Sequence, residues 1–209
     1  MEFKELMEKF YNLEKQVNNL TEQINKPAII NFAKVRPDAI MPNKRKEDAG
    51  YDLYANVDAD VIIIEPHTTT LVPTGIASAF SSDYVLKLWE RGSTGTKGMG
   101  QRSGVIDSGY RGEIKAPITN HNDKPIMICK FNKDNIPEVV KVFYSEENIV
   151  EKFSDELPIN SCVFYPYTKA ITQGTLIYTG DSVVEEISYD ELKAIPSERG
   201  TGLLGSSNK

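Results

Sequence analysis

The stretch VIIIEPHTTTLVPTGIASAF, residues Val61–Phe80, contains two short apolar runs on either side of a Pro-His pair. Val, Ile and Thr dominate both runs, and branched side chains of this kind are enriched in β-strands. Proline and glycine beside or within the runs are typical of the ends of strands and of turns. The pattern predicts strands at Val61–Glu65 and Thr69–Phe80.

The same β-type pattern extends in both directions, from Pro27 to Ile187. No long helical pattern alternates with these runs, so a parallel sheet with crossover helices is not expected. An all-β sandwich or jelly roll fits instead. Ser188 and Glu191 have the spacing of a helix capping box, which predicts one or two helical turns at Ser188–Ile195. The further predicted strands are Ala28–Val35, Val85–Arg91, Gly112–Thr119, Ile126–Phe131, Val139–Tyr144, Cys162–Tyr165 and Leu176–Ile187.

Residues 1–26 differ from everything that follows. Their apolar side chains recur in steps of three and four, as in the a and d positions of a heptad repeat, and the other positions are mostly charged or polar. This narrow seam favours a short coiled coil that Pro27 ends; the alternative is a helix packed on its own domain. The seam consists of Phe3, Leu6, Phe10, Leu13, Val17, Leu20 and Ile24.

The composition excludes several classes of protein. The net charge of −6 gives no electrostatic case for nucleic-acid binding, and no apolar run reaches membrane-spanning length. The charged N-terminus is not a secretory signal, so we expect a cytoplasmic protein. Cys129 and Cys162 lie in apolar stretches and are expected to be buried, reduced thiols; with His67 and His121 they show no zinc-ligand spacing.

Three separated blocks carry residues suited to chemistry. In DAGYDLYA, Asp48–Ala55, Asp52 lies between apolar neighbours. In ERGSTGTKG, Glu90–Gly98, glycines, hydroxyl groups and two cations form a candidate anion cradle, although the Walker spacing is absent. In GVIDSGYRGEI, Gly104–Ile114, a hairpin is expected to bring a carboxylate, an aromatic ring and a cation to one side.

These blocks resemble, in this order, the motifs of the trimeric dUTP pyrophosphatase family. The first matches the AGxDL pattern, the second resembles an RSS or RSG loop followed by lysine, and the third matches GVIDxxYRG. KAITQ, Lys169–Gln173, resembles a fourth motif that is usually GDRIAQ. The glycine-rich tail, which starts RGTGLLGSS at Arg199, resembles the family's C-terminal arm. The resemblance runs from Ile29 to the end, apart from about residues 132–160.

The resemblance implies a jelly roll, residues 27–195, that forms a homotrimer with sites between subunits. It implies hydrolysis of dUTP to dUMP and pyrophosphate, which keeps uracil out of DNA and supplies dUMP for dTMP synthesis. Asp107 would be the general base, Asp52 would hold Mg²⁺ through water, and residues 196–209 would close as a flexible arm. Substrate contacts would come from Arg91, Gly92, Ser93, Lys97, Gln101, Gly104, Val105, Ile106, Tyr110, Gln173, Arg199, Leu204, Gly205, Ser206 and Ser207.

Three departures from the family pattern affect these roles. Gly92 stands where the family has Ser directly after the arginine, so either Ser93 shifts by one residue or a backbone N–H replaces the hydroxyl. Leu204 replaces the usual aromatic over uracil and stacks less well. The usual Gly-Asp-Arg is missing from the fourth motif, where Lys169 is expected to supply the cation.

The segment 132–160 resembles an insertion between the third and fourth motifs. Its acidic and β-branched residues predict an acidic β-hairpin on the surface, and the alternative is a docking site for a protein partner. Such inserts occur in phage-type members of the family, so a bacterial or phage-infected host is the expected setting.

Two rival functions remain open at this point. A dCTP deaminase, or a bifunctional deaminase–dUTPase, shares the fold and would need a glutamate base, for which Glu113 is the candidate. A non-catalytic regulatory trimer that binds dUTP or a repressor protein is the other. The presence of Asp52, Asp107, Tyr110, Gln173 and Arg199 argues against lost catalysis.

Overall fold

The computed structural model describes residues 3–24, 26–145 and 148–197, and it confirms the all-β class. The chain divides into two compact units, residues 1–179 and 180–209. In chain order the elements are α1 (Phe3–Ile24), β1 (Ile30–Lys34), β2 (Tyr51–Leu53), β3 (Val61–Ile64), β4 (Thr69–Pro73), β5 (Ile76–Phe80), β6 (Tyr84–Trp89), α2 (Gly92–Gly95), β7 (Met99–Gln101), β8 (Val105–Ile106), β9 (Lys115–Asn120), β10 (Ile126–Cys129), β11 (Val139–Ser145), β12 (Asn148–Phe153), the 3-10 turns η1 (Ser154–Glu156) and η2 (Ile159–Ser161), β13 (Val163–Pro166), β14 (Thr172–Tyr178) and α3 (Tyr189–Ala194).

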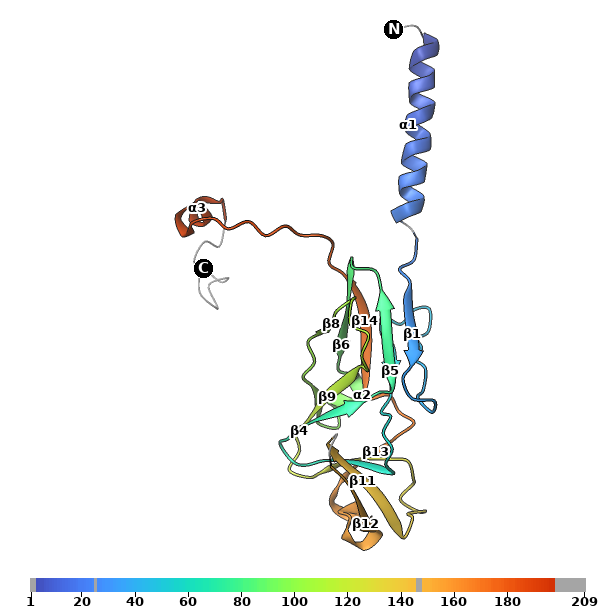
Figure 1. Ribbon diagram of the computed structural model, residues 1–209, viewed down its shortest axis with the longest axis vertical. Helices are drawn as coiled ribbons and strands as arrows, with labels where there is room; N and C mark the ends of the chain where they lie inside the picture. The colour runs from blue at the N-terminus through green and yellow to red at the C-terminus, as the bar shows by residue number, and fades with distance from the viewer. Residues whose placement is uncertain (1–2, 25, 146–147, 198–209) are drawn as a thin grey trace. The chain divides into compact units, whose positions relative to one another are not determined.

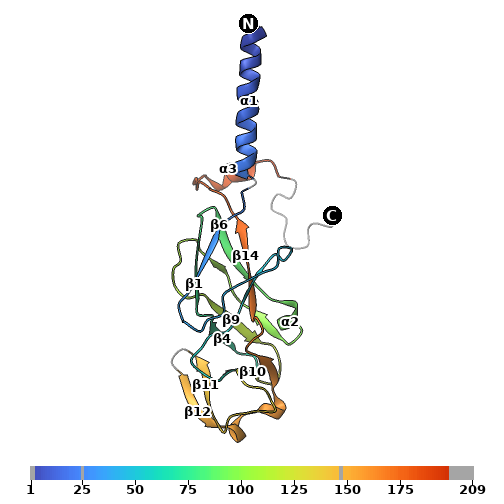
Figure 2. The same cartoon turned by 90° about the vertical axis from the view of Figure 1, so that its right-hand side faces the viewer.

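The strands form a jelly roll of small sheets, and the strands that pair within a sheet are mostly far apart in the sequence. The strand orders are β12-β11-β3-β10-β13, β2-β14-β6-β8, β4-β9-β7 and β1-β5. Pairing is antiparallel except between β10 and β13 and between β11 and β3. In Figures 1 and 2, β11 and β12 lie at one end of the β unit and β1, β6 and β14 at the other, with β4 and β9 between them.

The central strands β3 and β10 of the five-stranded sheet are buried on both faces. Along β3, Ile62 and Ile64 pack into one apolar cluster while Val61 and Ile63 pack into another. Side chains alternate between the two faces of a strand, so a run of four apolar residues is stable only where both faces are covered. A third cluster, built around Leu53, Leu86 and Leu88, underlies the sheet that carries the candidate site.

The predicted strand Thr69–Phe80 is two strands, because the chain turns at Gly75. This glycine has a φ of +68°, and a Cβ placed there would lie 2.7 Å from the Ala39 Cβ. Its N–H donates to the Glu113 carboxylate at 2.6 Å. Glycine therefore provides both the left-handed backbone and the space that the turn requires.

The predicted strand Leu176–Ile187 was wrong at both ends. Strand β14 covers Thr172–Tyr178, and residues 179–187 form no strand. Val183 and Val184 have branched side chains, which give β-propensity to a segment that forms no strand. Strands β2 and β7 were not predicted, because three residues give too little periodicity.

The predicted hairpin in Gly104–Ile114 was only partly correct. Its turn exists, since the Tyr110 N–H donates to the Asp107 carbonyl at 3.0 Å. The flanking strands do not pair with each other: β8 pairs with β6, and β9 pairs with β4 and β7. The turn therefore connects two sheets.

The segment 132–160 contains the predicted hairpin, in which β11 pairs antiparallel with β12. Strand β11 is not a surface addition, because Val140, Val142 and Phe143 are buried and β11 also pairs with β3. Strand β12 and the acidic residues Glu138, Glu151, Asp155 and Glu156 are mostly exposed, as predicted.

Both predicted helices are present. Helix α1 spans Phe3–Ile24, and none of the described helices is long and apolar enough to cross a membrane. In α3 the capping box is confirmed: the Ser188 hydroxyl accepts from the Glu191 N–H at 3.2 Å, and the Ser188 N–H donates to the Glu191 carboxylate at 2.8 Å.

Both cysteines are free thiols, as predicted. Burial raises the pKa of the Cys129 thiol to about 12, whereas Cys162 is only partly buried. A thiol whose pKa is this high carries almost no thiolate at neutral pH, so Cys129 serves as a small apolar side chain.

Candidate functional site

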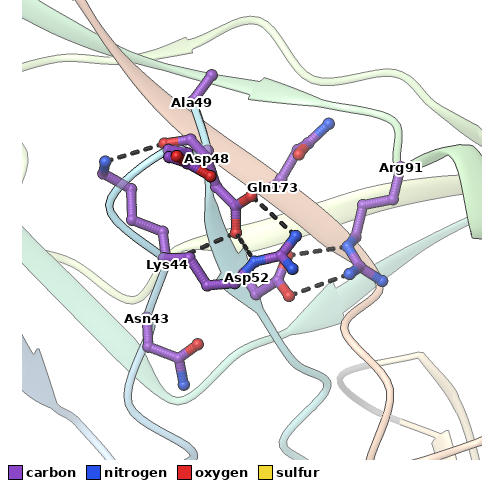
Figure 3. A pocket seen from close by; sticks show the side chains of 10 residues that line it. Asn43, Lys44, Asp48, Ala49, Asp52, Arg91 and Gln173 are labelled. Atoms are coloured by element: carbon purple, nitrogen blue, oxygen red, sulfur yellow. Dashed lines mark hydrogen bonds and ion pairs between the residues drawn. The ribbon is translucent and has the colours of Figure 1, made fainter.

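An open cleft of about 660 Å³ brings the first motif together with residues of the second and fourth. Figure 3 shows Asp52, Arg91 and Gln173 around one space, with the loop from Asn43 to Ala49 along its rim. The cleft forms because β14 pairs with both β2 and β6, so that Gln173 stands opposite Asp52 and Trp89. It is lined by Asn43, Lys44, Arg45, Glu47, Asp48, Ala49, Gly50, Asp52, Arg91 and Gln173.

Asp52 and Arg91 form a two-pronged ion pair at the base of this cleft. Arg91 Nε donates to Asp52 Oδ1 at 2.9 Å, and Nη2 donates to Oδ2 at 3.0 Å. Both side chains are about three-quarters buried. A bidentate arginine–carboxylate contact fixes the guanidinium plane as well as its position.

Two further contacts complete the guanidinium's surroundings. Arg91 Nη1 donates to the Ser93 hydroxyl at 3.1 Å and to the Ala170 carbonyl at 3.3 Å. The same carbonyl accepts from the buried Tyr165 hydroxyl at 2.7 Å, and burial raises the pKa of Tyr165. The hydroxyl that contacts the guanidinium thus comes from Ser93, one residue later than the family's serine.

The second motif winds into a single helical turn, α2. Thr94 is buried and closes it: its hydroxyl donates to the Arg91 carbonyl at 2.9 Å and accepts from the Arg91 N–H at 3.1 Å. The N–H groups of Gly92 and Ser93 belong to the first turn, where backbone donors have no acceptor inside the helix. A phosphate group is a suitable acceptor for such donors.

The loop before the first motif adds two cations that the sequence analysis missed. Arg45 makes a bidentate pair with Asp48 at 2.8 and 3.0 Å, and Lys44 Nζ donates to the Asp48 carbonyl at 2.9 Å. Hydrogen bonding to Arg45 lowers the pKa of Asp48. The basic run Asn43–Lys46, directly before the AGYDL block, was the available signal.

Gln173 lines both this cleft and a second one of about 460 Å³, which is also lined by Trp89, Gln101 and Ser103. Its Nε2 donates to the Glu90 carbonyl at 2.8 Å. A Cβ at Gly50 would lie 3.0 Å from Gln173 Oε1, so this glycine leaves the room that the amide occupies.

Of two other predicted binding residues, Gln101 lines the second cleft and Lys97 lines neither. The Gln101 amide donates to the Ser103 hydroxyl in the second cleft. Lys97 is exposed after α2, and its carbonyl accepts from Asn122 Nδ2 at 2.9 Å. The predicted cation Lys169 lies just before Ala170, in the turn between β13 and β14.

The residues of the third motif lie elsewhere on the same chain. In the antiparallel pairing of β6 with β8, Ile106 lies opposite Leu86, so the next residue, Asp107, comes level with Val85 near the start of β6. On the other side of β6, Gln173 lies opposite Trp89 at the end of that strand. Val85 and Trp89 are four residues apart along β6, which corresponds to roughly 13 Å. Neither cleft is lined by Gly104, Val105, Ile106, Asp107 or Tyr110.

Tyr110 is 45% exposed beside Asp107, which is also exposed. Its hydroxyl donates to the Glu113 carbonyl at 3.0 Å. A Cβ at Gly112 would clash with that hydroxyl, so glycine at 112 lets the ring lie along the turn. Arg199, Leu204, Gly205, Ser206 and Ser207 lie outside the described residues.

The cleft offers carboxylates to a cation but no dedicated metal cage. Among the described residues no three His, Cys, Asp or Glu side chains group as ligands. Mg²⁺ bound together with a polyphosphate needs only one or two carboxylates and retains several waters. Asp52, whose side chain is 29% exposed, fits such a contact through water, and both its oxygens also accept from Arg91.

Comparison with known proteins identifies the family. The model of the dUTPase family matches residues 37–153, which is more than half of the chain. The chain belongs to the dUTPase family. A deoxyuridine 5'-triphosphate nucleotidohydrolase from Leptospira interrogans is 32% identical over 126 residues, covering 58% of this chain and 86% of the relative. One from Bifidobacterium longum is 39% identical over 106 residues, covering 49% and 65%.

Solved structures support the same fold. The dUTPase of Staphylococcus bacteriophage 80alpha, solved with dUPNHPP, superposes with a TM-score of 0.60 at 21% identity and covers 87% of this chain and 99% of its own. A dUTPase from phage phi11 of S. aureus gives 0.54 at 20% identity, covering 76% and 96%; its description mentions a structural Mg(II) ion. The jelly-roll fold is thereby confirmed.

Proposed function

We propose that the protein hydrolyses dUTP to dUMP and pyrophosphate at sites that several copies of the chain share. The observation that carries the proposal is the cleft in which Asp52, Arg91 and Gln173 meet, on a chain that also presents the GVIDSGYRG turn. This activity is the one named for the chain's relatives. The setting we propose is the cytoplasm of a bacterium or of a phage-infected host.

Sharing of the site follows from the separation within one chain. Asp107 lies at the other end of β6 from Arg91 and Gln173, so one copy does not bring the base to its own phosphate cleft. A second copy is therefore needed to supply the turn from Gly104 to Tyr110. A closed homotrimer provides three equivalent sites of this kind.

Each group in the shared site has a separate task. Arg91, held rigidly by Asp52, and the first N–H groups of α2 bind phosphate oxygens. Asp107 accepts a proton from the water that attacks the α-phosphorus. The exposed ring of Tyr110 stacks on the deoxyribose and leaves no space for a 2′-hydroxyl, while the backbone from Gly104 to Ile106 pairs with uracil.

A bound Mg²⁺ would offset negative charge on the triphosphate, with Asp52 contacting its water shell. The arm from Arg199 would close over the nucleotide and exclude water. Leu204 would cover the base, and Gly205, Ser206 and Ser207 would add phosphate contacts.

The test is a pyrophosphate-release assay with dUTP, dTTP, dCTP, dATP, dGTP and UTP, with and without Mg²⁺. We expect dUTP to be hydrolysed at least about a hundredfold faster than the others, because a site that hydrogen-bonds one base rejects mispaired or bulkier ones by several kcal/mol. Comparable turnover of dCTP or UTP would contradict the proposal.

The deaminase alternative is weakened by the surroundings of Glu113. Its carboxylate accepts from the Gly75 N–H at 2.6 Å and lies 3.5 Å from Arg36 Nε, and its side chain is 12% exposed. A group used in this way as a structural acceptor is poorly placed to move protons on a substrate. Incubation with dCTP, with analysis for dUMP or dUTP, tests this directly.

A regulatory role is the second candidate, carried by strand β12. Its apolar side chains Ile149, Val150 and Phe153 are 44%, 37% and 57% exposed among acidic neighbours. This surface within 132–160 is suited to a protein partner. Binding of a partner that is lost on Phe153→Asp, with dUTP hydrolysis retained, would support it.

A further inference from the structure

The apolar seam of α1 is exposed along its described length. Phe3, Leu6, Phe10, Leu13 and Val17 are each between 51% and 78% exposed in the single chain. In proteins most of the stability of a helix comes from packing its apolar face rather than from intrinsic helix propensity. The family match begins at residue 37, so the helix lies outside it.

The pattern of the seam fits other copies of the same helix. With Phe3 at a, every a and d position from 3 to 24 is apolar and none is charged. A strict seam of period 3.5 packs well against an identical seam, because each a or d side chain then inserts into a space between side chains of the facing helix that recurs with the same spacing. Another surface would need a complementary groove with that repeat.

The flanking charges specify the direction of the helices. Lys9 occupies a g position and Glu14 the e position of the following heptad. These two positions meet between parallel, in-register helices, whereas antiparallel helices bring g against g and e against e. Within one chain Lys9 contacts Glu5 at 3.2 Å, but both side chains are more than half exposed, so this pair is weak and readily exchanged.

We propose that the α1 helices of three chains associate as a parallel, in-register coiled coil, with Lys9 of each chain beside Glu14 of the next. That three helices associate follows from the proposed homotrimer, whereas their parallel direction follows from the g and e charges of α1. This coiled coil of α1 helices, here called the stem, links the copies that share each active site. Its residues take no part in catalysis.

The experiment is disulfide trapping in the full chain. Leu6→Cys places a thiol on the seam near one end of the helix, and the matched control Glu8→Cys places one on the outer face. The unmodified chain controls for Cys129 and Cys162. We expect mild oxidation to link Leu6→Cys chains in pairs at least tenfold faster than Glu8→Cys chains. Equal rates, or no linkage at position 6, would overturn the parallel stem.

A charge exchange tests the direction independently. In the Leu6→Cys background, Glu14→Lys should slow linkage by setting lysines against each other, and Lys9→Glu combined with Glu14→Lys should restore it. Failure of the double exchange to restore linkage would contradict the assigned register.

Two further measurements separate this proposal from the proposed function. The rate of dUTP hydrolysis, measured for every variant, reports on the active site. A protein whose chains are linked at position 6 but that does not hydrolyse dUTP would support the stem and contradict the proposed function. Sedimentation velocity reports the number of chains, and a dimeric protein would overturn the three-stranded form.

Discussion

At the residue scale, Asp107 is exposed on a turn and its carboxylate is available to a water molecule. Asp107→Asn keeps the shape of the side chain and removes the base. We expect kcat for dUTP to fall by roughly 10²–10⁴, the usual range for general-base removal, with binding almost unchanged. Single-turnover kinetics and a titration with a non-hydrolysable dUTP analogue measure the two effects. Turnover at a tenth of the wild-type rate or faster would exclude Asp107 as the base.

Asp52 has two possible tasks, which one substitution can separate. Asp52→Asn removes the charged partner of Arg91, leaving the contacts to Ser93 and Ala170. Charge-assisted hydrogen bonds contribute about 1.5–3 kcal/mol, so we expect KM for dUTP to rise by about tenfold or more. Steady-state kinetics over a range of Mg²⁺ concentrations provide the measurement.

The Mg²⁺ dependence distinguishes the roles. If Asp52 only positions Arg91, the Mg²⁺ concentration for half activation stays constant; if it holds the metal's water shell, that concentration rises. Asp52→Glu, which keeps the charge, serves as the matched control and should recover part of the loss. Unchanged kinetics in Asp52→Asn would contradict both roles.

At the element scale, the turn between β4 and β5 depends on Gly75. Gly75→Ala must accommodate a φ of +68° and contacts of 2.7 Å to Ala39 and to Asn56. The left-handed backbone alone costs roughly 1–2 kcal/mol, and each kcal/mol lowers Tm by about 2–4 °C in a chain of this size. We expect a loss of several degrees in a thermal melt. Gly109→Ala, where an added Cβ meets nothing within 4 Å, is the control and should melt close to the wild type.

Strand prediction from sequence was reliable where burial and periodicity agreed. Val61–Glu65 and Ile126–Phe131 are runs buried on both faces, and both strands appeared close to their predicted bounds. Residues 179–187 have similar β-propensity but form no strand, and propensity alone does not reveal that. Sequence order also suggested that β8 and β9 pair, whereas tertiary packing assigned them to different sheets.

The candidate site was predictable to the extent that its motifs are contiguous. Asp52, Arg91 and Gln173 were named from blocks far apart in the chain, and strand pairing brings them into one cleft. Lys44 and Arg45 were missed because a basic run before a turn is usually a solvated surface. That Asp52 and Arg91 contact each other depends on β2, β14 and β6 being neighbours, which no local pattern encodes.

At the scale of the whole molecule, sharing of the site predicts complementation between inactive chains. Asp107→Asn and a truncation before Arg199 are each expected to be inactive. When they are unfolded and refolded together, about a quarter of the sites should combine an intact Asp107 with an intact arm from another chain, if the two groups come from different copies. Activity should return to about a quarter of the wild-type value per site.

The control for this experiment is native mass spectrometry of the mixture. Mixed assemblies that recover no dUTP hydrolysis would show that Asp107 and the arm must come from one chain. Recovery without mixed assemblies would point to contamination by active protein.

The ion pairs of the cleft also determine how strongly the protein attracts its substrate electrostatically at long range. Lys44, Arg45 and Arg91 are offset by Glu47, Asp48 and Asp52, and the whole chain carries −6. A balanced cleft on an acidic protein projects little attractive field, so a highly charged nucleotide is not steered to it over long range. We therefore expect the association rate measured by stopped flow to vary only weakly between about 20 and 200 mM salt, in contrast to the steep decline of steered encounters. Recognition then begins at contact, when phosphate oxygens meet guanidinium groups that the cleft's carboxylates already hold in position.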